Sequence, residues 1–495
     1  MFDENRPRIT RRNVLQTLGV SATVGVAGCA GGNGNGTGNG NGTGNGAADG
    51  PTSEDIESWG QRLNDHAREA DIDWRQFEGE SLVFGMNVHP FTALMEDFLP
   101  YFEELTGINV QFNTFPEDQL WQRLTLDLDS ETGQFDGFMT GLWPGSQYHE
   151  NEWVADLSQY HEDPSLTDQD WFAMDDFPDG VMASFRLGAD DDLIGIPFGV
   201  EGYGAVGYDE PTFESLGIEP PTDYPSMIDA AQAVHESDET DRVGIVSRAS
   251  STTLSSANWA TVFKSHGAEW IDRGSREATL NSSGGVASLE VFSELMGEYG
   301  APDIGSFDWY RSNQTFGNGG AGMVLHTPSA IGPWTDEQLE RTQWVPPVPG
   351  PDGQQVAAPW TWALGVSAYS RNPEAAWLFL QWAISREANL LQSTPVWPGH
   401  SPYGWAREGY IFDTDEWDEH GLKDSWVNAH QQALEMIPSD PPAVPLDVPQ
   451  NMDIMSEAAI AMNFAVTGEK TAQEALDDAA PEITDHAQDI PDRYL

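Results

Sequence analysis

Three apolar strand patterns alternate with two helix patterns early in the chain, and this order constrains the fold more than any other feature. Strands that alternate with helices predict a parallel sheet covered by helices on both faces. In such sheets ligands bind at the carboxyl ends of the strands. We therefore expect residues 87–90 and 142–146, which follow two of the strands, to lie at one rim. The expected elements are strand 81–88, helix 90–106 ending at Gly107, strand 108–112, helix 117–129 and strand 135–141.

A second block, residues 190–224, has short apolar runs around a glycine-rich segment. The pattern predicts a strand at Leu193–Phe198, a turn at Gly199–Gly204 and a strand at Ala205–Tyr208. Glycine is favoured where the backbone bends sharply or approaches another group closely. A short helix from Thr212 follows, and a glycine and a Pro-Pro pair end it. By itself this pattern indicates a hairpin followed by a helix.

Acidic side chains far outnumber basic ones. The chain of 495 residues has 80 Asp and Glu against 22 Lys and Arg, a net charge of −58. Such a chain would repel itself in dilute buffer, whereas in molar salt the Debye length falls to about 3 Å, so the balance indicates adaptation to high salt. A disordered acidic chain is the alternative, and 39% hydrophobic residues with 19 tryptophans argue against it. The same charge disfavours nucleic acid as a partner.

The N-terminal residues have the pattern of an export signal. Arg11 and Arg12 precede a short uncharged segment, residues 17–28, which is too short to cross a bilayer as a helix. The paired arginines resemble a twin-arginine signal, and residues 26–29, Val-Ala-Gly-Cys, resemble a lipoprotein processing site. Cys29 is the only cysteine of the chain, so a disulfide within the monomer is excluded.

These patterns predict where the protein is located. We expect residues 1–28 to be a twin-arginine lipoprotein signal peptide and Cys29 to be lipidated. Residues 29–50, which are rich in glycine and asparagine, are expected to be a flexible tether. Acyl chains would then hold the protein at the outer face of the cell membrane.

Several further stretches resemble, in the same order, the extracellular solute-binding proteins of ABC importers, especially the branch that binds sugars and polyols. The most specific is 195–222, which is similar to the family consensus GIPF…YN…F…GI…PP.T. Asp209 departs from the usual residue of this consensus and leaves the fold expectation intact. The resemblance extends from about Ser81 to Ile490. The other matching stretches are Phe102–Val110, Phe135–Met139, Trp153–Leu157, Phe316–Met323, Trp362–Ser367, Asn372–Leu380 and Gly468–Leu476.

The resemblance implies an α/β fold with two lobes, the type II periplasmic-binding-protein-like fold. Each lobe would be a mixed sheet flanked by helices, with the ligand in a cleft between the lobes. The chain would cross between lobes near Val200–Glu201 and near Ala357–Trp362, and Gly199, Gly202 and Gly204 would serve the first hinge. The implied divisions are an N-terminal helical extension at 51–80, lobe one at 81–200 with a return at 357–395, and lobe two at 201–356 with C-terminal helices at 396–495.

Aromatic and polar side chains near the expected strand ends are the candidates for ligand contact. Aromatic rings pack against the C–H faces of sugars, and a carboxylate such as Glu201 accepts two hydroxyl hydrogen bonds. Core packing is the alternative for the tryptophans, helix capping for His89 and a solvated hinge acid for Glu201. Trp259 and Trp397 are further candidates. The expected ligand-binding residues are Asn87, His89, Trp143, Ser146, Glu201, Tyr203, Ser329, Trp360 and Trp362.

The sequence contains no HExxH, CxxC, Walker or nucleophile-elbow motif. The run Asp190–Asp192 lacks the ligand spacing of a calcium loop and is expected to be a solvated turn. We therefore expect a monomeric binding protein without catalytic residues, cofactor or metal.

The expected protein closes on a sugar or polyol and delivers it to the permease and ATPase of an ABC importer. Three alternatives remain. The ligand could be a polyamine or a glycerophosphodiester. A secreted glycoside hydrolase would turn its substrate over. A surface-layer or adhesion protein would show internal repeats, and none is visible.

Overall fold

The structure is a computed structural model that describes residues 52–495, except 178, 189, 332–333, 394–422 and 439–441. The expected signal peptide, Cys29, the tether and Trp397 lie outside the described residues. The described chain begins with helix α2 (Ser53–Ala67), whose first turn is closed by a capping box between Thr52 and Asp55. Helix α2 packs against helix α3 of the first sheet.

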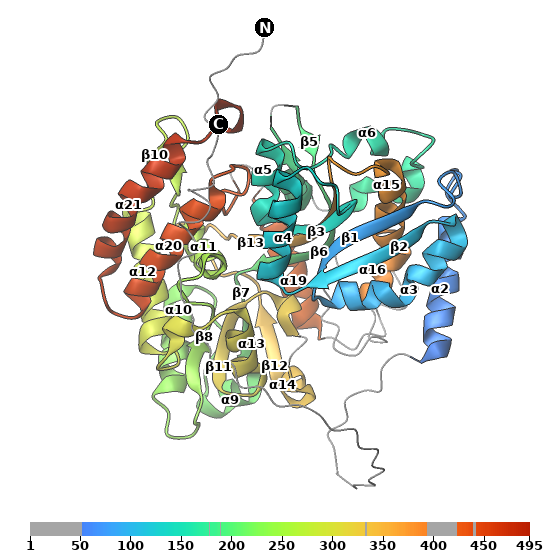
Figure 1. The fold of residues 1–495 in the computed structure, drawn as a ribbon. Helices are drawn as coiled ribbons and strands as arrows, with labels where there is room; N and C mark the ends of the chain where they lie inside the picture. The colour runs from blue at the N-terminus through green and yellow to red at the C-terminus, as the bar shows by residue number, and fades with distance from the viewer. Residues whose placement is uncertain (1–51, 178, 189, 332–333, 394–422, 439–441) are drawn as a thin grey trace, which may run out of the picture. The chain divides into compact units, whose positions relative to one another are not determined.

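The first sheet is mixed and has helices packed against it (Figure 1). Strand β1 is parallel to β2 and β3, as the alternating pattern predicted, and β13 is antiparallel to β3 and β6. Phe84 of β1 lies 4.8 Å from Phe379 of α15, measured between ring centroids, and both are fully buried. The strand order is β2 (Asn109–Phe115), β1 (Ser81–Asn87), β3 (Gly137–Gly141), β13 (Ala358–Val366) and β6 (Ile196–Tyr203). Its helices include α3 (Pro90–Thr106), α4 (Glu117–Asp129), α5 (Leu142–Glu150) and α15 (Pro373–Ala383). We call this sheet and its helices lobe one.

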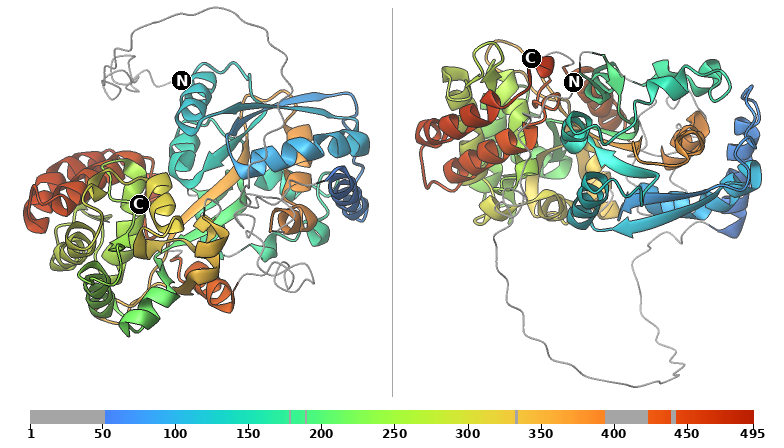
Figure 2. Two further views of the ribbon diagram at one scale, coloured as in Figure 1. Left: turned by 90° about the horizontal axis from the view of Figure 1, so that it is seen from below. Right: turned by 45° about the horizontal axis from the view of Figure 1, so that its top comes forward.

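The second sheet, with its helices, forms lobe two. Strand β8 is parallel to β11, whereas β7 is antiparallel to both β11 and β12. The paired helices α20 and α21 pack against α12 on the flank of this lobe (Figure 2). The strand order is β12 (Thr342–Val345), β7 (Ala205–Asp209), β11 (Ala321–His326) and β8 (Val243–Val246). The helices include α10 (Tyr224–His235), α11 (Ser256–Ser265), α12 (Ser283–Ser293), α13 (Trp309–Gly317), α20 (Asn451–Val466) and α21 (Ala472–Gln488).

Trp259 belongs to the core of lobe two. Its side chain is fully buried, its ring lies 5.3 Å from that of Trp270, and its Nε1 donates to Ser288 Oγ at 3.2 Å. Phe263 stacks on Trp270 with 3.8 Å between ring centroids. Core packing, which was the alternative for the tryptophans, therefore applies to Trp259.

The expected hairpin around the glycine-rich segment is wrong, because its two strands belong to different sheets. Strand β6 continues through the predicted turn to Tyr203 and lies in lobe one, and β7 begins at Ala205 in lobe two. Gly204 alone separates the two strands. Its φ of 115° is a backbone angle that residues other than glycine rarely adopt. Gly202 instead lets α19 (Asp424–Glu435) approach β6, since a Cβ there would lie 2.9 Å from Ala433 Cβ.

The chain therefore leaves the first sheet at Gly204, four residues after Val200. The return connection runs through residues 346–357, between β12 and β13, so Ala358–Trp362 is already part of a strand of lobe one. In the two sheets, Ala358 pairs with Tyr203 and Val345 pairs with Val206. The two connections between the lobes thus start and end beside each other.

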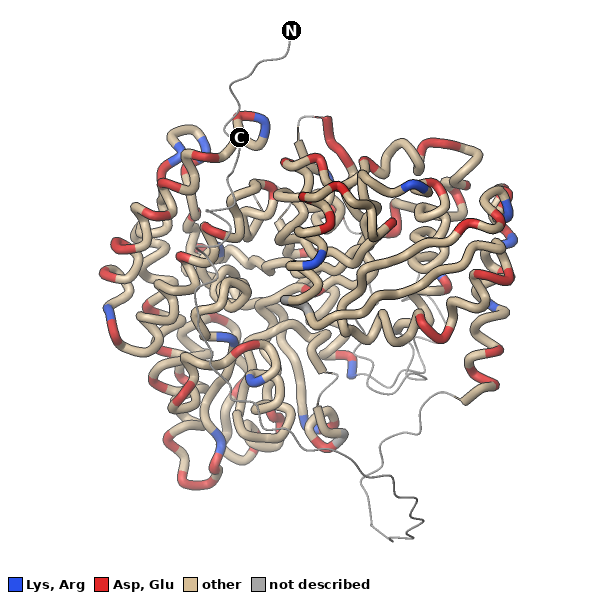
Figure 3. Tube along the Cα trace, viewed as in Figure 1, with Lys and Arg blue, Asp and Glu red and all other residues tan. Residues whose placement is uncertain are grey.

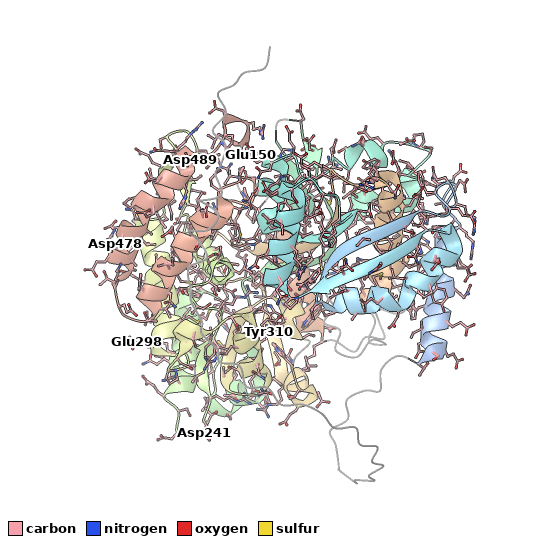
Figure 4. The ribbon with its side chains drawn as sticks, in the orientation of Figure 1. Glu150, Asp241, Glu298, Tyr310, Asp478 and Asp489 are labelled. Atoms are coloured by element: carbon pink, nitrogen blue, oxygen red, sulfur yellow. The ribbon has the colours of Figure 1, made fainter. Side chains whose placement is uncertain are left out.

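The C-terminal turn η7 (Asp492–Tyr494) contacts both lobes. Arg493 forms an ion pair with Glu150, the last residue of α5, which is labelled in Figure 4. Arg273 of lobe two donates to the backbone carbonyl of Tyr494 at 3.2 Å. A contact outside the two crossing segments therefore links the lobes in this structure.

Acidic residues are spread along the whole of the described chain, in both lobes (Figure 3). Asp241, Glu298, Asp478 and Asp489 are exposed and lie on the outside of the ribbon (Figure 4). This distribution places like charges in solvent, where salt screens their repulsion.

Asp209, at the end of β7, is by contrast fully buried. Arg341 donates to both of its carboxylate oxygens, at 2.7 and 2.8 Å, and Arg242 lies 3.1 Å from Oδ2. Its Oδ1 also accepts the backbone N–H of Thr212 and so caps α9 (Glu210–Leu216). Burial would raise the pKa of Asp209, but the hydrogen bonds from Arg341 and Thr212 and the charge of Arg242 outweigh it and lower the pKa.

We predict that Asp209→Asn lowers the free energy of unfolding by about 3–5 kcal/mol at neutral pH, because two arginines lose their buried carboxylate. The folded-state pKa is depressed, so the stabilisation is present above the unfolded-state value of about 3.9 and disappears as pH falls through the folded-state value. Urea unfolding in molar KCl over a pH series measures both effects. Asp238→Asn, at an exposed position, is the control. Equal destabilisation by the two variants would contradict this account.

Candidate functional site

Four tryptophans form an aromatic cluster in lobe one. Trp360 and Trp362 are two residues apart on β13, so their side chains lie on the same face of the strand. Their ring centroids are 5.2 Å apart. Trp143 of α5 lies 6.2 Å from Trp360, and Trp121 of α4 lies 6.3 Å from Trp362. The predicted residues Trp143, Trp360 and Trp362 are thus brought together.

Glu201 joins this cluster through the sheet register. It lies directly opposite Trp360, and paired residues present their side chains on the same face. Glu201 is 2% exposed, so its carboxylate faces protein groups in this structure. Trp143 Nε1 is buried and finds no acceptor among the described residues. A carboxylate and an indole N–H beside aromatic faces suit a ligand that carries both hydroxyl groups and C–H surface.

Asn87 and His89 border the cluster at the end of β1. Asn87 is the last residue of the strand and is buried. His89 is the N-cap of α3, where its Nδ1 accepts the N–H of Phe91 at 3.1 Å. The His89 ring also lies 5.6 Å from Trp362. The capping alternative for His89 is therefore correct, and the ring reaches the aromatic cluster as well.

A polar cluster lies where β8 and β11 of lobe two end. These strands are parallel, so their carboxyl ends share one rim, which carries Arg248 and His326. Tyr203, the last residue of β6, accepts a hydrogen bond from Arg248 Nη2 at 2.6 Å, and its ring lies 5.3 Å from that of His326. Burial, with a further contribution from the Arg248 charge, holds the pKa of His326 well below its usual range, so this imidazole is neutral.

Ser146 and Ser329 are fully buried, and their hydroxyl groups are bonded within the protein. Ser146 Oγ donates to the carbonyl of Val448 at 2.9 Å and accepts from Asn451 Nδ2 at 3.2 Å, which fixes α5 to α20. Ser329 Oγ lies 2.7 Å from Thr327 Oγ1. The structure therefore gives both serines structural contacts and does not bring them into the aromatic cluster.

Sequence reasoning missed Trp121 and Arg248. Arg248 follows strand β8 in a run of polar residues, 247–253, Ser-Arg-Ala-Ser-Ser-Thr-Thr. The strand-end rule that selected residues 87–90 would have selected this run too. Trp121 lies inside a helix, and no local pattern distinguishes it from a core residue.

A hollow of about 700 Å³ lies elsewhere in lobe two, against η4 (Glu294–Glu298) and the turn from α20 to α21. Its lining includes Glu290 and Lys470, and Lys470 pairs with Asp478 at 2.8 Å. Tyr299 is the one aromatic residue in its lining, so the hollow lacks the several aromatic faces that the cluster in lobe one has. We therefore place the candidate site at the aromatic cluster.

Within the described residues, no group of three or more His, Cys, Asp or Glu side chains is arranged to hold a metal ion. The same part of the chain has no helix that is long and apolar enough to cross a membrane.

The sequence profile described as bacterial extracellular solute-binding protein matches residues 87–390. An erythritol/L-threitol-binding protein of Mycolicibacterium smegmatis is 28% identical over 340 residues, which are 64% of this chain and 69% of that protein. A probable amino-acid ABC transporter periplasmic-binding protein of Sinorhizobium fredii is 24% identical over 60% of this chain and 67% of that protein. A solute-binding protein of Agrobacterium radiobacter, solved with ribitol, superposes with a TM-score of 0.68 at 18% identity and covers 82% of this chain and 99% of that one.

The family profile spans more than half of the chain, so the protein belongs to the bacterial extracellular solute-binding proteins. The structural match shows the fold, which is that of the two-lobe binding proteins of ABC transporters. The α/β fold expected from the resemblance is thereby confirmed.

We predict that Trp143→Phe lowers the free energy of unfolding only through the lost side-chain volume. No hydrogen bond is lost, because Nε1 has no acceptor among the described residues. Trp377→Phe is the matched control. Trp377 is also fully buried, and its Nε1 donates to Thr167 Oγ1 at 2.8 Å. Both variants lose the same side-chain volume, but Trp377→Phe also loses a hydrogen bond. We therefore expect Trp377→Phe to lower the free energy of unfolding by about 1–2 kcal/mol more than Trp143→Phe does. Urea unfolding in molar KCl measures the difference, and equal losses would mean that Trp143 Nε1 is bonded in the folded protein.

Proposed function

We propose that this protein is the membrane-anchored binding subunit of an ABC importer, and that it binds a sugar or polyol and delivers it to the permease. The observation that carries the proposal is the buried aromatic cluster that contains Trp143, Trp360 and Trp362, with Glu201 beside it. Aromatic faces bind the C–H surface of a polyhydroxy compound, and a carboxylate accepts its hydroxyl hydrogen bonds.

The relatives support this ligand class. One is an erythritol/L-threitol-binding protein, and the ribitol complex is a binding protein of the same fold. Erythritol, threitol and ribitol are acyclic polyols. Another relative is a probable amino-acid ABC transporter periplasmic-binding protein, so amino acids are the compounds to compare with these polyols.

The proposed mechanism is closure of the two lobes around the ligand. The crossing at Gly204 and the segment 346–357 are the positions where backbone rotation would move one lobe against the other. A ligand that contacts both lobes favours the closed arrangement by its differential affinity, and the permease would select that arrangement. We infer a binding protein without turnover, acting as a monomer.

Export by the twin-arginine route and acylation of Cys29 complete the proposal. A folded chain with this many acidic groups would work at the outer face of the membrane in concentrated salt. The glycine- and asparagine-rich residues 30–50 would leave the lobes free to reach the permease.

We predict that polyols raise the melting temperature of the protein in molar KCl, since binding at 100 times Kd adds about 2.7 kcal/mol of stability. The panel should contain erythritol, threitol, ribitol, mannitol, common sugars, polyamines, glycerophosphodiesters and amino acids. Glu201→Ala and Trp362→Ala are expected to weaken binding of the compound that gives the largest shift. Asp238→Asn, at an exposed position, should bind normally. If no sugar or polyol shifts the melting temperature, the proposed ligand class is wrong.

We also predict that Cys29→Ser moves the protein from the membrane fraction to the medium when the full chain is expressed in a cell that processes such signals. The reason is that the substitution removes the atom to which acyl chains would be attached. Immunoblots of both fractions give the measurement, and the wild-type chain is the comparison. Full retention of the variant would exclude lipid anchoring through this residue.

A further inference from the structure

Arg248 differs from the other arginines of the described residues. Most of them lie within 4 Å of an acidic side chain, as Arg341 does with Asp209. Arg123 and Arg371 have no such ion pair within the described residues, but both are exposed. Arg248 has no acidic partner there either, and it is only 7% exposed. Within the part of the chain that the structure describes, it is thus a buried cation without an ion-pair partner.

The hydrogen bonds of Arg248 leave part of the guanidinium group without an acceptor. Nη2 donates to Tyr203 Oη at 2.6 Å, and Nη1 donates to the carbonyl of Leu254 at 3.2 Å. Both acceptors are neutral. Nε is buried and has no acceptor among the described residues. A guanidinium group has five N–H donors in a planar fork that fits a carboxylate, and burial without one costs several kcal/mol.

Among the described residues, the imidazole and the hydroxyl groups near Arg248 carry no negative charge. His326 is neutral for the reason given above and lies against the Tyr203 ring. The loop that follows contributes the hydroxyl groups of Ser250, Thr252 and Ser255, which lie within 2.7–3.0 Å of one another. These groups are polar and uncharged, as suits a site for oxygen atoms of a small ligand.

Arg248 also has a defined place relative to the aromatic cluster. Its partner Tyr203 and the acid Glu201 are two residues apart on β6, so they share one face at a spacing of about 7 Å. Glu201 in turn lies opposite Trp360. The series Arg248, Tyr203, Glu201 and Trp360 therefore leads from the rim of lobe two to the aromatic cluster of lobe one.

We propose that Arg248 binds the carboxylate of the ligand, and that the ligand is a sugar acid or another small polyhydroxy carboxylate. The carboxylate would accept two hydrogen bonds from the guanidinium group. The hydroxyl-bearing carbons would extend along β6 to Glu201 and the tryptophans. This inference rests on the proposed function, because it names the chemistry of the compound bound at the same site.

The test compares each polyol with its acid on the exported protein in molar KCl. Ribitol and ribonate, and threitol and threonate, are measured by isothermal titration calorimetry, with glycine and alanine as simple carboxylates. We expect the acid to bind at least about tenfold more tightly than its polyol. In Arg248→Gln the affinity for the acid should fall by about thirtyfold or more, as when one member of a buried charge pair is removed. The affinity for the polyol should fall much less.

Two further variants complete the design. Arg248→Lys keeps the charge but not the planar fork, so it should recover only part of the affinity for the acid. Arg123→Gln, at an exposed arginine without an ion pair in the described part of the chain, should bind like the wild type. Melting curves show whether Arg248→Gln is folded, and if it is not, the ratio of acid to polyol affinity in the wild type still decides.

The other outcomes are distinct. If polyols bind and their acids do not, the carboxylate inference is wrong and the proposed function stands. If neither these compounds nor any sugar or polyol of the melting-temperature panel binds, the proposed function itself fails. Equal weakening of both compounds by Arg248→Gln would make Arg248 a structural residue and overturn the inference. A melting temperature that depends on chloride through Arg248, without any preference for the acids, would identify a chloride site and also overturn it.

Discussion

The arrangement of the protein depends on a single residue between two sheets. Strand β6 ends in lobe one at Tyr203, and β7 begins in lobe two at Ala205. Gly204 makes the change of direction with a positive φ, and its N–H donates to the carbonyl of His326 at 3.2 Å. Because so little chain separates the strands, the end of a strand in one lobe lies against a strand end in the other. The candidate site is a consequence of this short connection.

Charge imposes the second constraint. Acidic groups on the surface are tolerated where salt screens them, but the same groups inside the protein need partners. Asp209 has Arg341, which directly precedes β12, and Arg242, which directly precedes β8, so these contacts join the end of β7 to both edge strands of the sheet. Arg248 is the opposite case, a buried cation without an acid among the described residues. Because acidic side chains are abundant in this chain, the missing acidic partner is the reason to assign Arg248 a role in ligand binding.

Much of the fold could be predicted from the sequence, because local patterns determine it. The alternating strands and helices of residues 81–141 predicted the parallel core of lobe one, and β1 does pair with β2 and β3. The glycine-rich segment was misread because glycine favours turns and close packing alike. At Gly202 the neighbour is Ala433, which is more than two hundred residues away and invisible to local reasoning. The partners of Ser146, Val448 and Asn451, are about three hundred residues away and are equally invisible to local reasoning.

The candidate site was predictable to the extent that strand ends define it. Trp143, Trp360, Trp362 and Glu201 meet because β3, β13 and β6 are neighbours. Trp143 follows the end of β3 as expected, whereas Glu201, Trp360 and Trp362 lie inside β6 and β13 and not on loops at strand ends. The strand-end rule does not distinguish a hydroxyl group that is bonded inside the protein from one that is available.

Tyr203 connects these observations. It ends β6, pairs with Ala358 where the return connection enters β13, and accepts a hydrogen bond from Arg248. A ligand at Arg248 would therefore act on a side chain held by both connections between the lobes. Any change in the position of the guanidinium group would be transmitted to Tyr203, next to the residue with the positive φ. Ligand binding at Arg248 would therefore be coupled to the hinge at Gly204 through one side chain, that of Tyr203, and not through the core of either lobe.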